Sequence, residues 1–342
     1  RDYAVTGVQT CALPIYKLIV PIVNDIQNTG LTGTTCVLTR TNEEAMQATG
    51  LLLKNKIQAK LIQSNDSFSL NQMLEVRYFI DALNLKEDLY VINDAVWESA
   101  KTELKNKFQK SNKLEICNNI IRDFEQTNPK NKYKSDMDTF IRESKLEDFY
   151  NDGSETILVS TIHKAKGKEF DNVFMLLNGL HPDTDEAKRL LYVAMTRAKQ
   201  NLTIHLNTKS LDYIRPVQNM FSLIDNNEYE LPLKIVTQLT HKDVWLDYFI
   251  NKQSLISQLI SGDKLTINDD GCTNSNGQSI LKFSKSLTKQ IADFKSNDYE
   301  LEEAGVNFIV YWKKEDEEME VKIILPEIHF IKNNVLDRKS VV

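Results

Sequence analysis

The sequence has few of the features that define disulfide-rich, zinc-binding or membrane-spanning proteins. Its cysteines are scattered over 342 residues without a C-x-x-C pair; they are Cys11, Cys36, Cys117 and Cys272. This spacing argues against a disulfide framework and a zinc site, and it favours a reducing, cytoplasmic environment. No stretch is both apolar and long enough to span a membrane. We therefore expect a cytoplasmic protein without a membrane partner or a metal site of its own.

Two further absences limit the chemistry that this chain can perform alone. It contains no G-x-x-x-x-G-K-[ST] segment, so it has no P-loop to cradle the phosphates of a nucleotide. It also has no strand-borne acidic pair of the kind that holds Mg²⁺ in phosphoryl transfer. Any nucleotide hydrolysis would therefore depend on residues that this sequence does not contain.

The chain is moderately acidic, with 48 Asp and Glu residues, 42 Lys and Arg residues and a net charge of −6. A negative total does not exclude nucleic-acid binding, because counterion release depends on local basic clusters. One such cluster comprises Lys164, Lys166, Lys168, Lys188, Arg189, Arg197 and Lys199. The apolar content of 41% is enough for a sizeable core, and the length predicts about two domains.

The most informative segment is a polar loop between two apolar runs. Residues 156–160 (TILVS) and 171–177 (DNVFMLL) have the composition of buried strands. The loop between them carries a hydroxyl, an imidazole, three lysines, a glycine and a carboxylate. Loops at strand ends in open α/β sheets often form ligand sites. Gly167 can adopt a positive φ and let the backbone approach a phosphate or a base.

A predicted helix that ends near an arginine follows the second strand. Asp183 stands three residues before Glu186, which is typical of a helix N-terminus, and apolar residues then recur at helical spacing through Ala194. Arg197 falls near the end of this helix, just before a third predicted strand over residues 201–206. The buried helix would hold the guanidinium on a rigid support.

Residues 159–170 (VSTIHKAKGKEF) and 189–199 (RLLYVAMTRAK) resemble motifs V and VI of the UvrD-like superfamily 1 DNA helicases in order and spacing. Each segment alone has an ordinary structural explanation, because lysine-rich loops are often solvated and an arginine near a helix C-terminus complements the helix dipole. Their occurrence together favours the helicase interpretation. The resemblance implies the C-terminal portion of such an enzyme, with its second RecA-like motor domain.

The resemblance also implies roles for individual residues, with ATP and Mg²⁺ as cofactors and single-stranded or duplex DNA as partner. Arg197 would be the arginine finger, and it would contact the nucleotide together with Gly167 and Glu169. The DNA contacts would come from the loop; they are Thr161, His163, Lys164 and Lys166. The family commonly has an apolar residue at the position of Lys168, so the packing of Glu169 stays open. The missing first motor domain would supply the P-loop and the Mg²⁺ ligands.

A third match lies upstream. Residues 34–40 (TTCVLTR) predict a strand, and Thr41 to Glu44 form a capping box that opens a helix through about Leu53. This segment resembles the LYR-[TS]-N segment that follows motif IV in the same family. Its implied role is mainly architectural.

The next stretch matches the family less closely. Phe68 and Glu75 resemble the aromatic and the acid of the following motif, although Asn65 and Asp66 replace the glycines that usually precede the aromatic. A single aromatic beside an apolar helix usually packs in a core. We therefore expect Phe68 to be buried rather than stacked on a base.

The sequence predicts an α/β fold with three parts. Residues 16–87 and 153–225 would form a RecA-like motor domain, a parallel sheet with helices on both faces. Residues 88–152 would form a charged helical insertion, smaller than the one usual in the family. Residues 226–336 would form a small α+β C-terminal domain.

Within that last part, residues 242–260 have the pattern of an amphipathic helix. Three strands are predicted over residues 279–283, 306–312 and 321–325, and a helix over residues 286–295. Some superfamily members end in an SH3-like or Tudor-like barrel, and no residue makes that match specific. Tyr311 and Trp312, beside two lysines, are either a nucleic-acid or partner surface or half core and half surface.

The two ends of the chain resemble translated sequencing adapter. These segments are residues 1–15 (RDYAVTGVQTCALPI) and 337–342 (DRKSVV), and we expect both to be artefactual flanks outside the fold. An alternative is a β-rich N-terminal arm in which Cys11 to Ile15 form a strand edge.

The sequence therefore predicts the C-terminal fragment of an ATP-dependent DNA helicase or translocase, of 3′-to-5′ polarity by family alone. Such an enzyme couples ATP hydrolysis to movement on single-stranded DNA. Two alternatives stay open: a degenerate RecA-like binding or scaffold domain without hydrolysis, and the helicase half of a helicase–nuclease.

Overall fold

The computed structural model describes residues 12–62, 68–83, 91–149, 156–211, 220–227, 233–314 and 317–333. They divide into two compact units. Unit 1 comprises residues 1–62 and 152–236, and unit 2 comprises residues 63–151 and 237–342. Residues 68–83, which the sequence assigned to the motor domain, fall in unit 2. None of the helices in the described ranges has the length and apolar character needed to cross a membrane.

Unit 1 contains a five-stranded sheet in the order β2-β5-β1-β6-β7. Every neighbouring pair of strands in it is parallel. The strands are β1 (Thr35–Thr39), β2 (Ala59–Leu61), β5 (Ile157–Thr161), β6 (Phe170–Leu177) and β7 (Ala198–Leu206). The helices are α1 (Ala12–Asn28), α2 (Asn42–Lys54) and α7 (Asp185–Met195).

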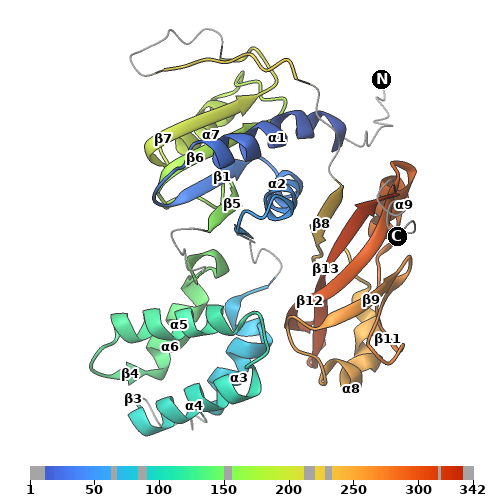
Figure 1. Cartoon of the computed structure of the whole chain (residues 1–342). Helices are drawn as coiled ribbons and strands as arrows, with labels where there is room; N and C mark the ends of the chain where they lie inside the picture. The colour runs from blue at the N-terminus through green and yellow to red at the C-terminus, as the bar shows by residue number, and fades with distance from the viewer. Residues whose placement is uncertain are drawn as a thin grey trace, which may run out of the picture. The chain divides into compact units, whose positions relative to one another are not determined.

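Both faces of this sheet are covered. On one face, α1 and α2 (blue in Figure 1) pack against Val37, Val159 and Phe174, all of which are buried. The alternate strand residues, such as Leu38 and Met175, are fully buried as well, because successive side chains of a strand point to opposite faces. The predicted fold class, a RecA-like parallel sheet with helices on both sides, is thereby confirmed.

Local signals place most elements of unit 1. The predicted capping box is present, since the Thr41 hydroxyl accepts from the Glu44 amide and the Glu44 side chain accepts from the Thr41 amide. The start of α7 differs by one residue, because Thr184, not Asp183, caps the helix by accepting from the Ala187 amide.

The proposed adapter segments lie mostly outside the described residues. Residues 1–11 and 334–342 are not described, whereas Ala12 to Ile15 form the first turn of α1. A strand edge at these residues, the alternative considered for the N-terminal arm, is therefore wrong for residues 12–15.

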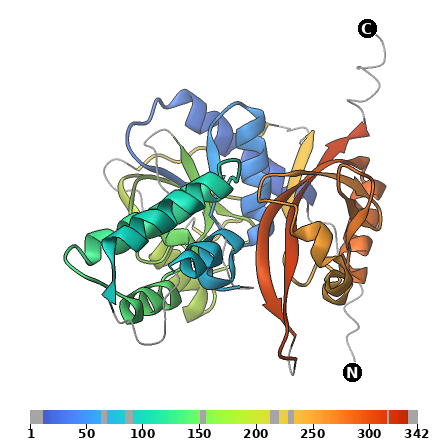
Figure 2. The same ribbon diagram turned by 90° about the horizontal axis from the view of Figure 1, so that it is seen from below.

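Unit 2 combines a helical segment with most of a six-stranded sheet in the order β11-β10-β9-β12-β13-β8, in which residues 234–236 at the start of β8 are assigned to unit 1. The longest strands, β12 and β13, pair antiparallel as a curved hairpin (red, Figure 2). The sheet strands are β8 (Lys234–Gln238), β9 (Lys264–Asn268), β10 (Gly271–Thr273), β11 (Ser279–Lys282), β12 (Tyr299–Lys313) and β13 (Glu320–Lys332). The accompanying helices are η3 (Leu246–Lys252), α8 (Gln253–Ile256) and α9 (Lys285–Ser296).

The helical segment begins before the insertion that the sequence predicts over residues 88–152, because η1 (Leu70–Gln72) and α3 (Leu74–Ala82) belong to it as well. Its other elements are β3 (Val91–Ile92), α4 (Asp94–Lys107), α5 (Leu114–Thr127), β4 (Lys132–Tyr133), α6 (Lys134–Glu143) and η2 (Leu146–Phe149). The β3 and β4 strands form a two-stranded sheet of their own. Pro129 lies in the bend between α5 and β4.

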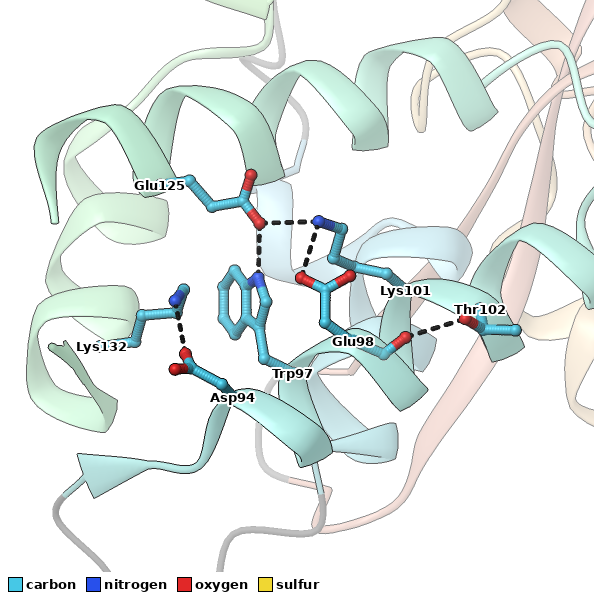
Figure 3. A network of polar contacts seen from close by, with 7 residues as sticks. All are labelled: Asp94, Trp97, Glu98, Lys101, Thr102, Glu125 and Lys132. Atoms are coloured by element: carbon cyan, nitrogen blue, oxygen red, sulfur yellow. Dashed lines mark hydrogen bonds and ion pairs between the residues drawn. The ribbon is translucent and has the colours of Figure 1, made fainter. Parts of the chain in front are cut away.

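Trp97 of α4 is the centre of this helical segment (Figure 3). Its side chain is fully buried and packs against the rings of Phe79 and Phe124, with centroids 5.1 and 5.5 Å away. Its indole N–H donates to Glu125 Oε1 over 2.7 Å, and Lys101 Nζ donates to the same oxygen over 2.8 Å. Burial alone would raise the pKa of Glu125, but these hydrogen bonds outweigh it and lower that pKa.

The helical segment and the sheet of unit 2 share a core. Phe68 is 7% exposed and its ring lies 5.2 Å from that of Phe308 in β12, so the expectation that it packs in a core is confirmed. Lys113 Nζ donates to Asn307 Oδ1 over 2.7 Å. Glu75 is fully buried and accepts a 2.6 Å hydrogen bond from the Ser111 hydroxyl. The residues that resembled a family motif therefore serve the interior of unit 2.

Residues 242–260 do not form the predicted amphipathic helix. They form the 3-10 helix η3 and the short α8. Val244 instead makes a β-bridge with Phe283, and the Gln253 side chain exchanges hydrogen bonds with the backbone of Lys322. These contacts with the sheet replace the helical hydrogen bonds that the pattern favoured, because tertiary contacts override periodicity over short segments.

Candidate functional site

The polar loop that the sequence singled out connects β5 to β6 and is tightly turned. The amides of Lys164 and Ala165 both donate to Thr161 O, over 3.0 and 3.2 Å, and the Lys168 amide donates to Ala165 O over 3.1 Å. Gly167 has a φ of +87°, as expected for a residue that must adopt a left-handed backbone. A Cβ at Gly167 would meet no atom within 4 Å, so the backbone here is open to a ligand.

The register of the sheet places the two ends of this loop at opposite edges of the sheet. We call them the carboxyl edge, where the parallel strands end, and the amino edge, where they begin. Thr161 is paired with Thr39 at the carboxyl ends of β5 and β1, whereas Phe170 begins β6 two residues before the pairing of Asn172 with Thr35. Thr161 is thus about six residues, or roughly 20 Å, from Phe170 along the strand direction. The candidate residues at the two ends of the loop therefore form two groups, and Lys166 and Gly167 lie next to each other on the segment that joins these ends.

The first group lies at the carboxyl edge, beside the start of α2. Thr161 is buried, whereas His163 and Lys166 are exposed. Lys164 Nζ donates a 2.6 Å hydrogen bond to Asn42 Oδ1, at the first residue of α2. This contact joins the loop to the Thr-Asn segment whose role we expected to be mainly architectural. Asn42 is thus a site residue that the sequence interpretation missed, although the motif resemblance contained the signal.

The capping box fixes the position of Asn42. Glu44 Oε2 accepts from the backbone amides of Arg40 and Thr41, over 2.9 and 3.1 Å. Burial raises the pKa of Glu44, and the two backbone hydrogen bonds oppose that rise. Because Glu44 holds the first turn of α2 in place, it also orients the acceptor that Lys164 uses.

The second group lies at the amino edge and centres on Arg197. Its Nη1 donates to Lys168 O over 3.1 Å, its Nε to Val193 O over 2.9 Å, and its Nη2 to Thr196 Oγ1 over 3.1 Å. The Phe170 amide donates to Arg197 O over 2.8 Å. The end of the loop and the end of α7 are therefore bonded to each other in both directions.

A second contact holds the same edge in register. The Asp171 carboxylate accepts from the amide and the hydroxyl of Thr34, over 2.8 and 2.9 Å. The backbone hydrogen bond from Thr34 lowers the pKa of Asp171. Gly33 lies so close to the Asp171 side chain that a Cβ at Gly33 would be 2.5 Å from Asp171 Oδ2, and its φ is +89°. The start of β6, next to Glu169 and Arg197, is thus tied to the start of β1.

This arrangement leaves the guanidinium partly available. Three of the five N–H groups of Arg197 are used in the hydrogen bonds above, which leaves two for an anionic ligand. The hydrogen bond from Nε to Val193 O is of the kind that arginines near a helix C-terminus commonly donate to the last carbonyls of the helix. Glu169 is exposed beside it. Nowhere in the described ranges do three or more His, Cys, Asp or Glu side chains gather as a metal site.

Two comparisons bear on the identity of the chain. Residues 84–209 match the family model of the UvrD-like helicase C-terminal domain. The chain is also 28% identical over 152 residues to a protein of Bacillus subtilis (strain 168) named "Putative ATP-dependent DNA helicase YjcD". That alignment covers 40% of this chain and 20% of the Bacillus protein, so the chain spans about a fifth of the relative's length. The resemblance to the C-terminal portion of a UvrD-like helicase is confirmed.

Proposed function

We propose that this chain supplies the second motor domain of an ATP-dependent DNA helicase or translocase that moves 3′ to 5′ on single-stranded DNA. The observation that carries the proposal is the loop between β5 and β6, whose two ends hold the two groups of candidate residues. Thr161, His163, Lys164 and Lys166 would contact DNA. Gly167, Glu169 and Arg197 would contact the nucleotide.

The proposed coupling follows from this geometry. Arg197 is bonded to the backbone at Lys168, and the loop is bonded to α2 through Lys164. A shift of the guanidinium toward a phosphate would break or stretch the bond to Lys168 O and so disturb the loop that contacts DNA. Motions of this kind, gated by closure of a cleft around ligand, are common in motor enzymes.

The residues around Gly167 and Arg197 would fit ATP but not its Mg²⁺. The open backbone at Gly167 and the two remaining guanidinium donors suit a nucleotide's sugar and phosphates. ATP would supply the phosphoryl group, and its Mg²⁺ would need ligands from elsewhere, because the described residues hold no carboxylate cluster of that kind. We propose that a P-loop motor domain provides them.

The DNA contact is tested through the two loop lysines. Replacing Lys164 and Lys166 with alanine should weaken the binding of oligo(dT) and flatten the dependence of log affinity on log salt by about 0.7 for each phosphate that is no longer neutralised. Fluorescence anisotropy at several salt concentrations measures the slope. Lys209→Ala, at an exposed lysine of the same unit that lies outside the basic cluster, is the control and should leave the slope unchanged. An unaltered slope in the double variant would mean that this loop does not contact DNA.

A further inference from the structure

Unit 2 carries an aromatic and basic surface that the motor proposal does not use. We call it the Trp245 patch, and it consists of Trp245, Tyr248, Lys252 and Lys282. The Trp245 side chain is 52% exposed, although large aromatic side chains are mostly buried in folded proteins. Its ring centroid lies 6.0 Å from that of Tyr248, with the two planes tilted by 33°.

The patch is held rigidly by the edge strand β11. The Trp245 amide donates to Lys282 O over 2.8 Å, and the preceding residue, Val244, forms a β-bridge with Phe283. The Tyr248 hydroxyl donates to Ser279 Oγ over 2.8 Å. The Tyr248 side chain and the backbone of Trp245 are therefore fixed before any ligand arrives, which lowers the entropic cost of binding.

The charge around these rings is positive. Lys252 Nζ lies 5.1 Å and Lys282 Nζ 5.8 Å from the centroid of the Tyr248 ring. The hydrogen bond to Ser279 lowers the pKa of Tyr248, and the charges of the two lysines lower it further. Two cations beside one ring disfavour a cationic ligand and favour an anionic one that has a flat group to stack.

The neighbouring surface has room for such a ligand. An open depression of about 550 Å³ begins at Ser279 and Lys282 and extends over Asn268 and Gly271. Two carboxylates line it, those of Asp269 and Asp270. Asp269 is paired with Lys295 over 2.7 Å, which reduces its repulsion of an anion, and Lys282 in the same lining supplies a positive charge.

The other aromatic pair of unit 2 is less suited to stacking. Arg77 and Lys322 already lie over the Tyr311 ring, at 5.3 and 5.6 Å from its centroid. Lys314 is paired with Asp247 over 3.1 Å. Tyr311 and Trp312 are both half-buried, which fits a pair that is half core and half surface.

We infer that the Trp245 patch binds single-stranded nucleic acid, with a base stacked on Trp245 and adjacent phosphates paired with Lys252 and Lys282. The inference rests on the proposed function only for the identity of the ligand. The patch lies in unit 2 and the β5–β6 loop lies in unit 1, so each can be altered without the other.

The test uses the full chain and a fluorescein-labelled oligo(dT). Trp245→Ala should lower the affinity about 5- to 100-fold, the range that corresponds to the stacking of one base. Trp245→Phe should retain most of the affinity, because it keeps an aromatic face. Lys252→Glu combined with Lys282→Glu should weaken binding and flatten the salt slope by about 0.7 for each phosphate that the lysines neutralise. Lys289→Glu, an exposed lysine on α9 in the same unit, should change the affinity much less.

Each outcome decides between the two sites. If the variants of the Trp245 patch, shown to be folded by circular dichroism, bind oligo(dT) like the unaltered chain, the inference is overturned, whatever the loop variants do. If they lose affinity while the Lys164 and Lys166 variants do not, the patch is supported and the loop assignment fails. An equal loss for duplex DNA would contradict base stacking, because paired bases cannot stack on Trp245.

Discussion

Replacing Arg197 with lysine should lower ATP turnover by about 10³- to 10⁵-fold in an enzyme that joins this chain to a P-loop motor domain. The guanidinium would meet charge that develops on the transferred phosphoryl group, an interaction stronger in the transition state than in the ground state. Lysine cannot reproduce the planar fork, so it could not keep the hydrogen bonds to Lys168 O and Val193 O while also forming a bidentate bond to the ligand. Steady-state turnover and nucleotide affinity, measured separately, should show that turnover falls far more than affinity.

Arg189 is the matched control for this substitution. It lies on α7, the helix that ends just before Arg197, and it is exposed. Its Nε donates to Asp185 O, one turn earlier in the same helix, over 3.1 Å. Arg189→Lys should therefore cost far less turnover. Near-normal turnover for Arg197→Lys together with abolished turnover for Arg189→Lys would assign the finger to the other arginine. If both variants kept full activity, the motor interpretation of α7 would fail.

Replacing Trp97 with alanine should lower the free energy of unfolding of unit 2 by about 3 to 5 kcal/mol. The side chain is fully buried between Phe79 and Phe124, so its removal leaves a cavity, and Glu125 is also deprived of the indole N–H. A decrease of this size is a large fraction of the roughly 5 to 15 kcal/mol that stabilises a typical domain. Urea unfolding followed by far-ultraviolet circular dichroism measures it.

Trp97→Phe separates packing from hydrogen bonding at this site. It keeps an aromatic ring between the same neighbours but removes the donor to Glu125, so we expect the free energy of unfolding to fall by about 1 to 3 kcal/mol. If Trp97→Ala cost less than this conservative change, the indole would not be the centre of the helical core.

The sequence predicts β1, β5, β6 and β7 of unit 1, with α2 and α7, because their signals are local, whereas α1 and β2 were missed. A continuous apolar run such as that of β5 indicates a buried parallel strand, and the capping box at Thr41 and Glu44 marks the start of α2. The separation of Thr161 from Arg197 could not be predicted in this way. It depends on the register of β6 against β1, which the chain sets by non-local contacts such as the clamp between Asp171 and Thr34.

Unit 2 was harder to predict because its elements depend on partners far away in the sequence. The apolar spacing of residues 242–260 favours a helix, yet Val244 and Gln253 bond to the sheet and only short turns remain. The start of β12 at Tyr299 was also missed, since Glu300 to Gly305 contain little apolar sequence. The contacts of Val244 and Gln253 with the sheet, which replace a continuous helix, also leave the Trp245 side chain exposed and so create the Trp245 patch.

The most direct test of the central claim, that this chain is one half of a motor, is steady-state ATP hydrolysis in the presence of oligo(dT). The chain alone should hydrolyse ATP at the background rate, because it has no P-loop. The same chain joined to a P-loop motor domain should reach about 1 to 100 s⁻¹, the range typical of phosphoryl-transfer enzymes. Turnover in that range by the chain alone, or background rates from the joined protein, would contradict the account.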